Sequence, residues 1–147
     1  MKFIKTEIEY LKESNAFNTV CVLIINNDNN VLILKRGPTA PWHPNEWSLV
    51  GGGVDNGETF IEAVLRETFE ETSLKLDKLD IVKFDYIEDI KESYNLIVYT
   101  CNKFSGTIEL DYENTDYKWV NELNYDKYVY IPHVKKLIEK YYEIYKN

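Results

Sequence analysis

The chain has 147 residues, of which 44% are hydrophobic and 29% charged. This balance suits one globular domain, expected over residues 1–147, and excludes a disordered or collagen-like chain. The longest unbroken apolar stretch, Val20–Ile25, is far shorter than the roughly 20 residues that span a bilayer, so no membrane is expected as a partner. Charged residues fill the N-terminal segment, which lacks the apolar centre of a signal peptide and therefore favours a cytoplasmic location.

Acidic residues outnumber basic ones by 25 to 17, for a net charge of -8. A nucleic-acid polymer is therefore not expected as a partner, because its phosphates require a basic surface. A small phosphate compound would need positive charge from another source, and a divalent metal is the simplest one. Cys21 and Cys101 lie 80 positions apart without metal-binding spacing, so we expect two reduced core residues.

The first fifteen residues fit a helix or an edge strand, and the pattern does not decide between them. Strands are expected at 19–25 and 31–34, joined by the turn residues 26–30 into a hairpin. A loop follows over 37–47, where Trp42, His43 and three prolines predict an ordered, pocket-lining segment.

A short strand is expected at 47–50, and Gly51, Gly52 and Gly53 predict a tight turn. Thr59 and Glu62 form a capping-box pattern, which predicts a helix over 59–72. Further strands are expected at 81–87, 94–101, 107–110 and 117–120, with an amphipathic closing helix over 131–142. Together these elements predict an α/β fold with a mixed sheet.

Three carboxylates, those of Glu67, Glu70 and Glu71, fall on one stripe of the predicted central helix. A second stripe, expected to face the core, is formed by Ile61, Leu65, Thr68 and Thr72. The segment 52–74 holds six acidic residues and one basic residue, Arg66. Such crowding is relieved by a bound cation, and carboxylate oxygens favour Mg²⁺ or Mn²⁺. A merely solvated acidic face is the alternative interpretation.

The spacing Gly52-x5-Glu58-x7-Arg66-Glu67-Thr68-x-Glu70-Glu71-x-Ser73-Leu74 resembles the signature box of the Nudix hydrolases. Two positions depart from that pattern: Thr68 replaces an aliphatic residue and Ser73 replaces a glycine. The threonine hydroxyl then needs a partner, such as the carbonyl four residues earlier. Ser73 requires either a left-handed conformation or a rebuilt helix end.

The resemblance implies an α/β/α sandwich with a central catalytic loop-helix and a C-terminal helix. It also implies hydrolysis of a nucleoside diphosphate linked to another group, with a nucleoside triphosphate or related small nucleotide as the favoured substrate. A homodimer is common among such proteins. The competing hypothesis is a degenerate Nudix domain that binds a nucleotide or a protein partner without turnover.

The resemblance also assigns roles to individual residues. It implies metal binding by Glu67, Glu70, Glu71 and the Gly52 carbonyl, with Mg²⁺ or Mn²⁺ as cofactor. Either Glu67 or the distal Glu113 would accept the proton of the attacking water, and Arg66 would orient Glu67. The substrate-binding candidates are Arg36, Trp42 and Glu58, although Glu58 could instead brace the loop. His133 has no evident partner in the sequence, so imidazole catalysis is not expected.

Overall fold

The computed structural model describes residues 17–146, so the expectation for the first fifteen residues lies outside the described part of the chain. The main sheet has the order β4-β1-β7-β6 and a second sheet has the order β3-β2-β9. Their strands are β1 (Phe17–Ile24), β2 (Val31–Arg36), β3 (Trp47–Ser48), β4 (Val50–Gly53), β6 (Val82–Asp89), β7 (Tyr94–Cys101) and β9 (Asn114–Val120). A small third sheet pairs β5 (Lys75–Leu76) with β8 (Phe104–Ser105).

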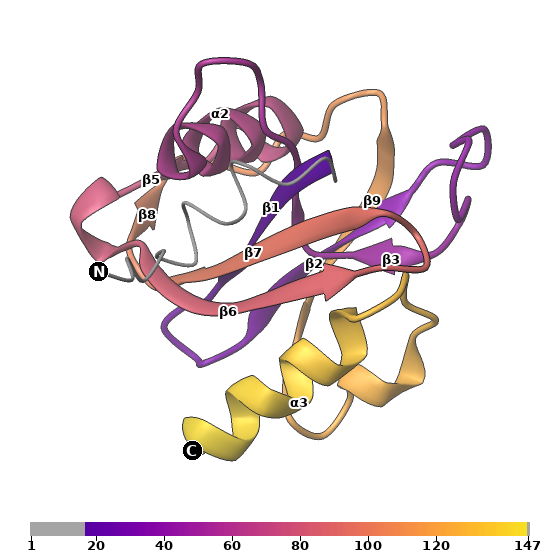
Figure 1. Ribbon diagram of the computed structural model, residues 1–147. Helices are drawn as coiled ribbons and strands as arrows, with labels where there is room; N and C mark the ends of the chain where they lie inside the picture. The colour runs from indigo at the N-terminus through magenta and orange to yellow at the C-terminus, as the bar shows by residue number, and fades with distance from the viewer. Residues whose placement is uncertain (1–16, 147) are drawn as a thin grey trace, which may run out of the picture.

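Helices α2 (Phe60–Thr72) and α3 (Val134–Ile144) cover opposite faces of the sheets (Figure 1). Successive side chains of β1 point to opposite faces of the sheet and contribute to two hydrophobic cores. Val20, Val22 and Ile24 pack on the side of α2, whereas Cys21 and Leu23 pack on the side of α3. Strand β1 runs parallel to β7 and antiparallel to β4, so the main sheet is mixed. The expected α/β/α sandwich is therefore confirmed.

The predicted hairpin of the first two strands is wrong. Strands β1 and β2 share only an isolated bridge between Ile25 and Val31 and then diverge into different sheets. Residues 20–24 of β1 and 31–34 of β2 are buried, so these parts of the strands need hydrogen-bonding partners along both edges. The hydrogen-bonding neighbours of β1 are β4 and β7, and those of β2 are β3 and β9.

The glycines also differ from prediction, because Gly51, Gly52 and Gly53 lie in β4 rather than in a tight turn. Gly51 pairs with Cys21 of β1, and a β-carbon at Gly51 would collide with the carbonyl oxygen of Val20. The absent side chain thus permits a close approach of two strands.

The strand predicted at 107–110 is absent from the described chain, where β8 ends at Ser105. Ile108 and Leu110 still pack against the core beside α2. The backbone N–H of Glu109 donates to the carbonyl of Thr72 at 2.9 Å. The segment 107–110 therefore donates a hydrogen bond to a free carbonyl at the C-terminal end of α2 instead of pairing with a strand.

The central helix matches its prediction closely. Thr59 caps α2, and the reciprocal hydrogen bonds of Thr59 and Glu62 complete the capping box. The Thr68 hydroxyl donates to the carbonyl of Val64 at 2.7 Å, as its position requires. The predicted core stripe is confirmed: Thr68 and Thr72 are buried, and Ile61 and Leu65 are half-buried and pack against the core. The prediction did not include the buried residues Phe60, Ala63 and Val64.

Helix α3 begins at Val134, later than predicted, because Pro132 and the left-handed His133 precede it. His133 Nε2 lies 2.7 Å from Oδ2 of Asp89, so the expectation that it lacks a partner is wrong. Cys21 and Cys101 are buried and unpaired, as predicted. Within residues 17–146, no helix is long and apolar enough to cross a membrane.

Ser73 ends α2 in the left-handed conformation, with φ at 65°. This conformation costs an ordinary residue about 1–2 kcal/mol, and glycine avoids most of that cost. The Ser73→Gly variant is therefore expected to raise the free energy of unfolding by about 0.5–1 kcal/mol, measured by urea denaturation. A less stable variant would show that the 3.4 Å hydrogen bond from the Ser73 hydroxyl to Glu109 outweighs the backbone strain.

Candidate active site

An acidic cleft of about 630 Å³ opens where α2, β4 and the segment before β9 meet. Three of its carboxylates come from α2 and two from the segment 111–113, while Arg36 lies at the end of β2. The lining residues are Arg36, Gly51, Gly52, Gly53, Glu67, Glu70, Glu71, Asp111, Tyr112 and Glu113. The fold thus brings every predicted metal-binding residue, together with Arg36 and Glu113, to one cleft.

Glu71 is the most buried carboxylate of the cleft, with 7% of its surface exposed. It accepts hydrogen bonds from the Gly51 N–H at 2.8 Å and from Asn114 Nδ2 at 3.0 Å. Burial nevertheless raises the pKa of Glu71 to about 8, because desolvation of the charged form outweighs these two donors. A nearby cation would reverse that balance by favouring the charged carboxylate.

The Glu67 carboxylate lies close to Gly52 in the cleft. A β-carbon at Gly52 would lie 2.5 Å from the Glu67 carboxylate, so only glycine leaves this carboxylate in place. Burial raises the pKa of Glu67, against the lowering effect of the Arg66 guanidinium. The glycine therefore lets a backbone segment and a side-chain carboxylate approach the same space.

Arg66, in the middle of α2, binds carboxylates of the helix and of the loop that precedes it. Its guanidinium donates to both oxygens of Glu58, at 2.8 and 3.0 Å, and to Glu67 at 2.8 Å. It also contacts Glu70 at 3.2 Å and the carbonyl of Gly53 at 2.9 Å. The hydrogen bonds from Arg66 lower the pKa of Glu58, which is absent from the cleft lining. Arg66 thus joins the loop, the helix and β4.

The segment before β9 supplies the opposite wall of the cleft. Its backbone is held by a 2.9 Å hydrogen bond from the Gly37 N–H to the carbonyl of Glu113. Asp111 also lines the cleft, although the sequence reasoning did not select it. Its place two residues before the predicted Glu113, in the same acidic stretch, is the signal that could have identified it.

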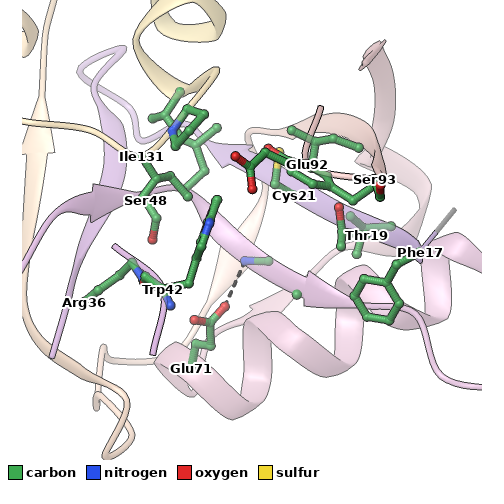
Figure 2. A pocket seen from close by; sticks show the side chains of 18 residues that line it. Phe17, Thr19, Cys21, Arg36, Trp42, Ser48, Glu71, Glu92, Ser93 and Ile131 are labelled. Atoms are coloured by element: carbon green, nitrogen blue, oxygen red, sulfur yellow. Dashed lines mark hydrogen bonds between the residues drawn. The ribbon is translucent and has the colours of Figure 1, made fainter. Parts of the chain in front are cut away.

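A second, more apolar cavity of about 430 Å³ adjoins the acidic cleft and shares Arg36, Gly51, Gly52 and Glu71 with it. Figure 2 shows Trp42 projecting into this cavity beside Arg36, with Glu71 pointing toward the backbone of Gly51. Arg36 Nε donates to the Trp42 carbonyl at 2.9 Å, and its guanidinium lies 5.6 Å from the Trp42 ring centre. A charged region and an aromatic region are therefore continuous.

The oxygen atoms available as metal ligands in the cleft suit a hard divalent cation, because they belong to carboxylates and a backbone carbonyl. In the part of the chain that the structure describes, the buried Glu71 carboxylate accepts hydrogen bonds from neutral groups, and Glu70 is half exposed at the rim. Within residues 17–146, no three Asp, Glu, His or Cys side chains already converge closely enough to enclose an ion. Binding would therefore require small movements of these side chains.

Comparison with known proteins agrees with this geometry. The family model described as the NUDIX domain matches residues 16–141. The chain belongs to the Nudix family. It is a Nudix hydrolase, and four residues of its box, Gly52, Glu67, Glu70 and Glu71, line the cleft, while Glu58 of the box contacts Arg66.

Individual relatives support the same assignment. The chain is 29% identical over 113 residues to a protein named nucleoside triphosphatase NudI from Escherichia coli O139:H28, covering 69% of this chain and 80% of that protein. The MutT protein from Methanosarcina mazei Go1 superposes with a TM-score of 0.73 at 26% identity, covering 92% and 99% of the two chains. The NUDIX domain of Shewanella oneidensis NrtR, solved with ADP ribose, shares the fold with a TM-score of 0.73 at 22% identity, covering 95% and 99%.

Glu71 makes the stability of the metal-free protein depend on pH. Its pKa is raised to about 8, so the unfolded chain releases this proton earlier and stability falls as pH rises from about 4.5 to 8. In the presence of a chelator, Glu71→Gln is expected to be more stable than wild type at pH 8, by an amount of the order of 1 kcal/mol, and to lose this advantage by pH 5. Urea denaturation at the two pH values measures the difference. A constant difference between the variants would contradict the burial of a charged carboxylate.

Proposed function

We propose that this Nudix hydrolase cleaves a nucleoside diphosphate linked to another group, with a nucleoside triphosphate as the preferred substrate class. The observation that carries the proposal is the continuity of the acidic cleft with the aromatic cavity through Arg36, Gly51, Gly52 and Glu71. Such an arrangement accommodates a molecule with a polyphosphate at one end and a planar base at the other. The NudI relatives, named nucleoside triphosphatases, favour the same substrate class.

The polyphosphate end belongs in the acidic cleft. Glu67, Glu70, Glu71 and the carbonyl of Gly52 would hold a divalent cation there, with Mg²⁺ or Mn²⁺ as the proposed cofactor. When bound, such a cation neutralises the phosphate oxygens and polarises phosphorus toward attack by water. Arg66 orients Glu67 through its 2.8 Å hydrogen bond and keeps the crowded helix partly neutralised. Glu58 braces the loop through its two contacts with Arg66 rather than contacting substrate.

Two carboxylates are placed to accept the proton of the attacking water. Glu67 lies on α2 and Glu113 on the opposite wall, and the charge of Glu113 contributes to the raised pKa of Glu67. Glu67 is already engaged by Arg66, whereas Glu113 is exposed to solvent. Either carboxylate would accept the proton of the water as the water oxygen bonds to phosphorus and the anhydride bond from phosphorus to the leaving phosphate group breaks.

The nucleoside end belongs in the aromatic cavity. Trp42 projects into the cavity and makes an edge contact with Tyr94, at 6.3 Å between ring centres (Figure 2). Stacking of a base on an aromatic ring contributes about 1–3 kcal/mol in other nucleotide-binding proteins. Arg36 lies between the two regions, where its guanidinium can contact a substrate phosphate.

The proposal is tested by incubating the protein with nucleoside triphosphates, nucleotide sugars, ADP-ribose and dinucleoside polyphosphates and separating the nucleotide products from the substrates by anion-exchange chromatography. Each substrate is tested with Mg²⁺, with Mn²⁺ and with a chelator. We expect metal-dependent turnover that is fastest with a nucleoside triphosphate. Turnover that persists in the chelator would contradict the metal site. Tight nucleotide binding without turnover of any substrate would favour the degenerate binding domain.

The metal-binding roles are tested by the double variant Glu70→Gln, Glu71→Gln. Losing two anionic ligands is expected to lower kcat at least about 100-fold while the fold remains intact, as judged by circular dichroism. A matched control, Glu139→Gln with Glu143→Gln, removes the same charge from α3 and should retain near-wild-type turnover. Near-normal rates in the Glu70 and Glu71 double variant would contradict the proposed metal site.

A further inference from the structure

Asn114 joins the two walls of the acidic cleft, although neither the Nudix box nor the sequence pattern singles it out. It is the first residue of β9, and only 7% of its surface is exposed. Its side-chain nitrogen donates to Glu71 Oε2 at 3.0 Å and to Asp111 Oδ1 at 3.2 Å. A primary amide carries two N–H donors, so one Asn can serve two carboxylates at once.

The backbone around Asn114 fixes the position of this amide. Asn114 lies opposite Arg36 in the register of β9 and β2, next to a register shift between Lys35 and Arg36. The Gly37 N–H donates to the carbonyl of Glu113 at 2.9 Å, immediately before Asn114. The sheet therefore fixes where the amide lies, and there the amide donates to one carboxylate from each wall of the cleft.

The chemistry of the amide suits this position. Glu71 and Asp111 repel each other, since the charge of Asp111 contributes to the raised pKa of Glu71. A lysine or arginine here would compete with a cation for both carboxylates, whereas a neutral amide donates without adding charge. The amide orients Glu71 and leaves the cleft anionic.

We propose that Asn114 is a positioning residue that orients Glu71 and anchors the segment 111–113, so that both walls present their carboxylates to one divalent cation. This inference rests on the proposed function, because it presumes that the cleft holds a cation. It goes beyond that function by assigning the alignment of the two walls to a single uncharged side chain.

The test is titration of the nucleotide-free protein with Mn²⁺, followed by the loss of the free-ion signal in electron paramagnetic resonance. Asn114→Leu has a similar shape and removes both N–H donors. We expect its Kd for Mn²⁺ to rise about tenfold and its kcat at a fixed subsaturating Mn²⁺ concentration to fall, with little change in the KM for nucleotide. Additional Mn²⁺ should restore much of the lost turnover.

Asn26→Leu is the matched control. Asn26 accepts backbone hydrogen bonds from Asp28 and Asn30 in the turn between β1 and β2, at the opposite end of β1 from the cleft. This variant should lose stability without any change in Mn²⁺ affinity. It therefore separates a positioning effect from general destabilisation.

Each outcome has a distinct meaning. Wild-type protein that binds no Mn²⁺ would overturn the proposed metal site itself. Wild-type binding with an unchanged Kd in Asn114→Leu would overturn only the role of Asn114. If Asn114→Leu fails to fold, Asn114→Val removes both donors and suits a strand, and a wild-type Kd in that variant would equally overturn the proposal.

Discussion

The concentration of carboxylates around one guanidinium is the constraint on which the rest of the site depends. Arg66 contacts Glu58, Glu67 and Glu70 within 3.2 Å, and also reaches the β4 carbonyl of Gly53. One cation cannot neutralise so many anions, and within residues 17–146 the hydrogen-bond donors to the most buried carboxylate, that of Glu71, are neutral. The protein thus holds a surplus of negative charge in a cleft that the glycine-rich strand keeps narrow.

The glycines connect this electrostatic arrangement to the fold. Gly51 allows β4 to lie close to β1, and Gly52 leaves room for the Glu67 carboxylate. As a result, the helix that packs on one face of the main sheet (Figure 1) brings its three carboxylates into one cleft with the glycines of β4. Trp42 projects beside Arg36 into the aromatic cavity (Figure 2), which adjoins the cleft at Gly51 and Gly52 of β4. The glycines of one strand therefore line both the charged and the aromatic region.

Features that depend on local chemistry could be predicted from the sequence. The capping box at Thr59, the back-bonded hydroxyl of Thr68 and the strained Ser73 all follow from residues within one or two turns of α2. The spacing from Gly52 to Glu71 also identified the cleft residues that this helix and β4 supply.

Features that depend on long-range pairing could not be predicted in the same way. The divergence of β1 and β2 into separate sheets follows from partners more than sixty residues away, such as β7 and β9. The pairing of His133 with Asp89 and the bridge from Asn114 to Glu71 likewise arise only when distant elements meet. No local pattern distinguishes Asn114 from the other asparagines of this chain.

The central claim is that one substrate spans the acidic cleft and the aromatic cavity with a divalent cation at its phosphates. A crystal grown with Mn²⁺ and a non-hydrolysable nucleoside triphosphate analogue tests it most directly, since anomalous scattering locates the ion. The account predicts an anomalous peak among Glu67, Glu70, Glu71 and the Gly52 carbonyl, with the base beside Trp42. A nucleotide bound outside the two connected regions, or an ion held away from these carboxylates, would contradict it.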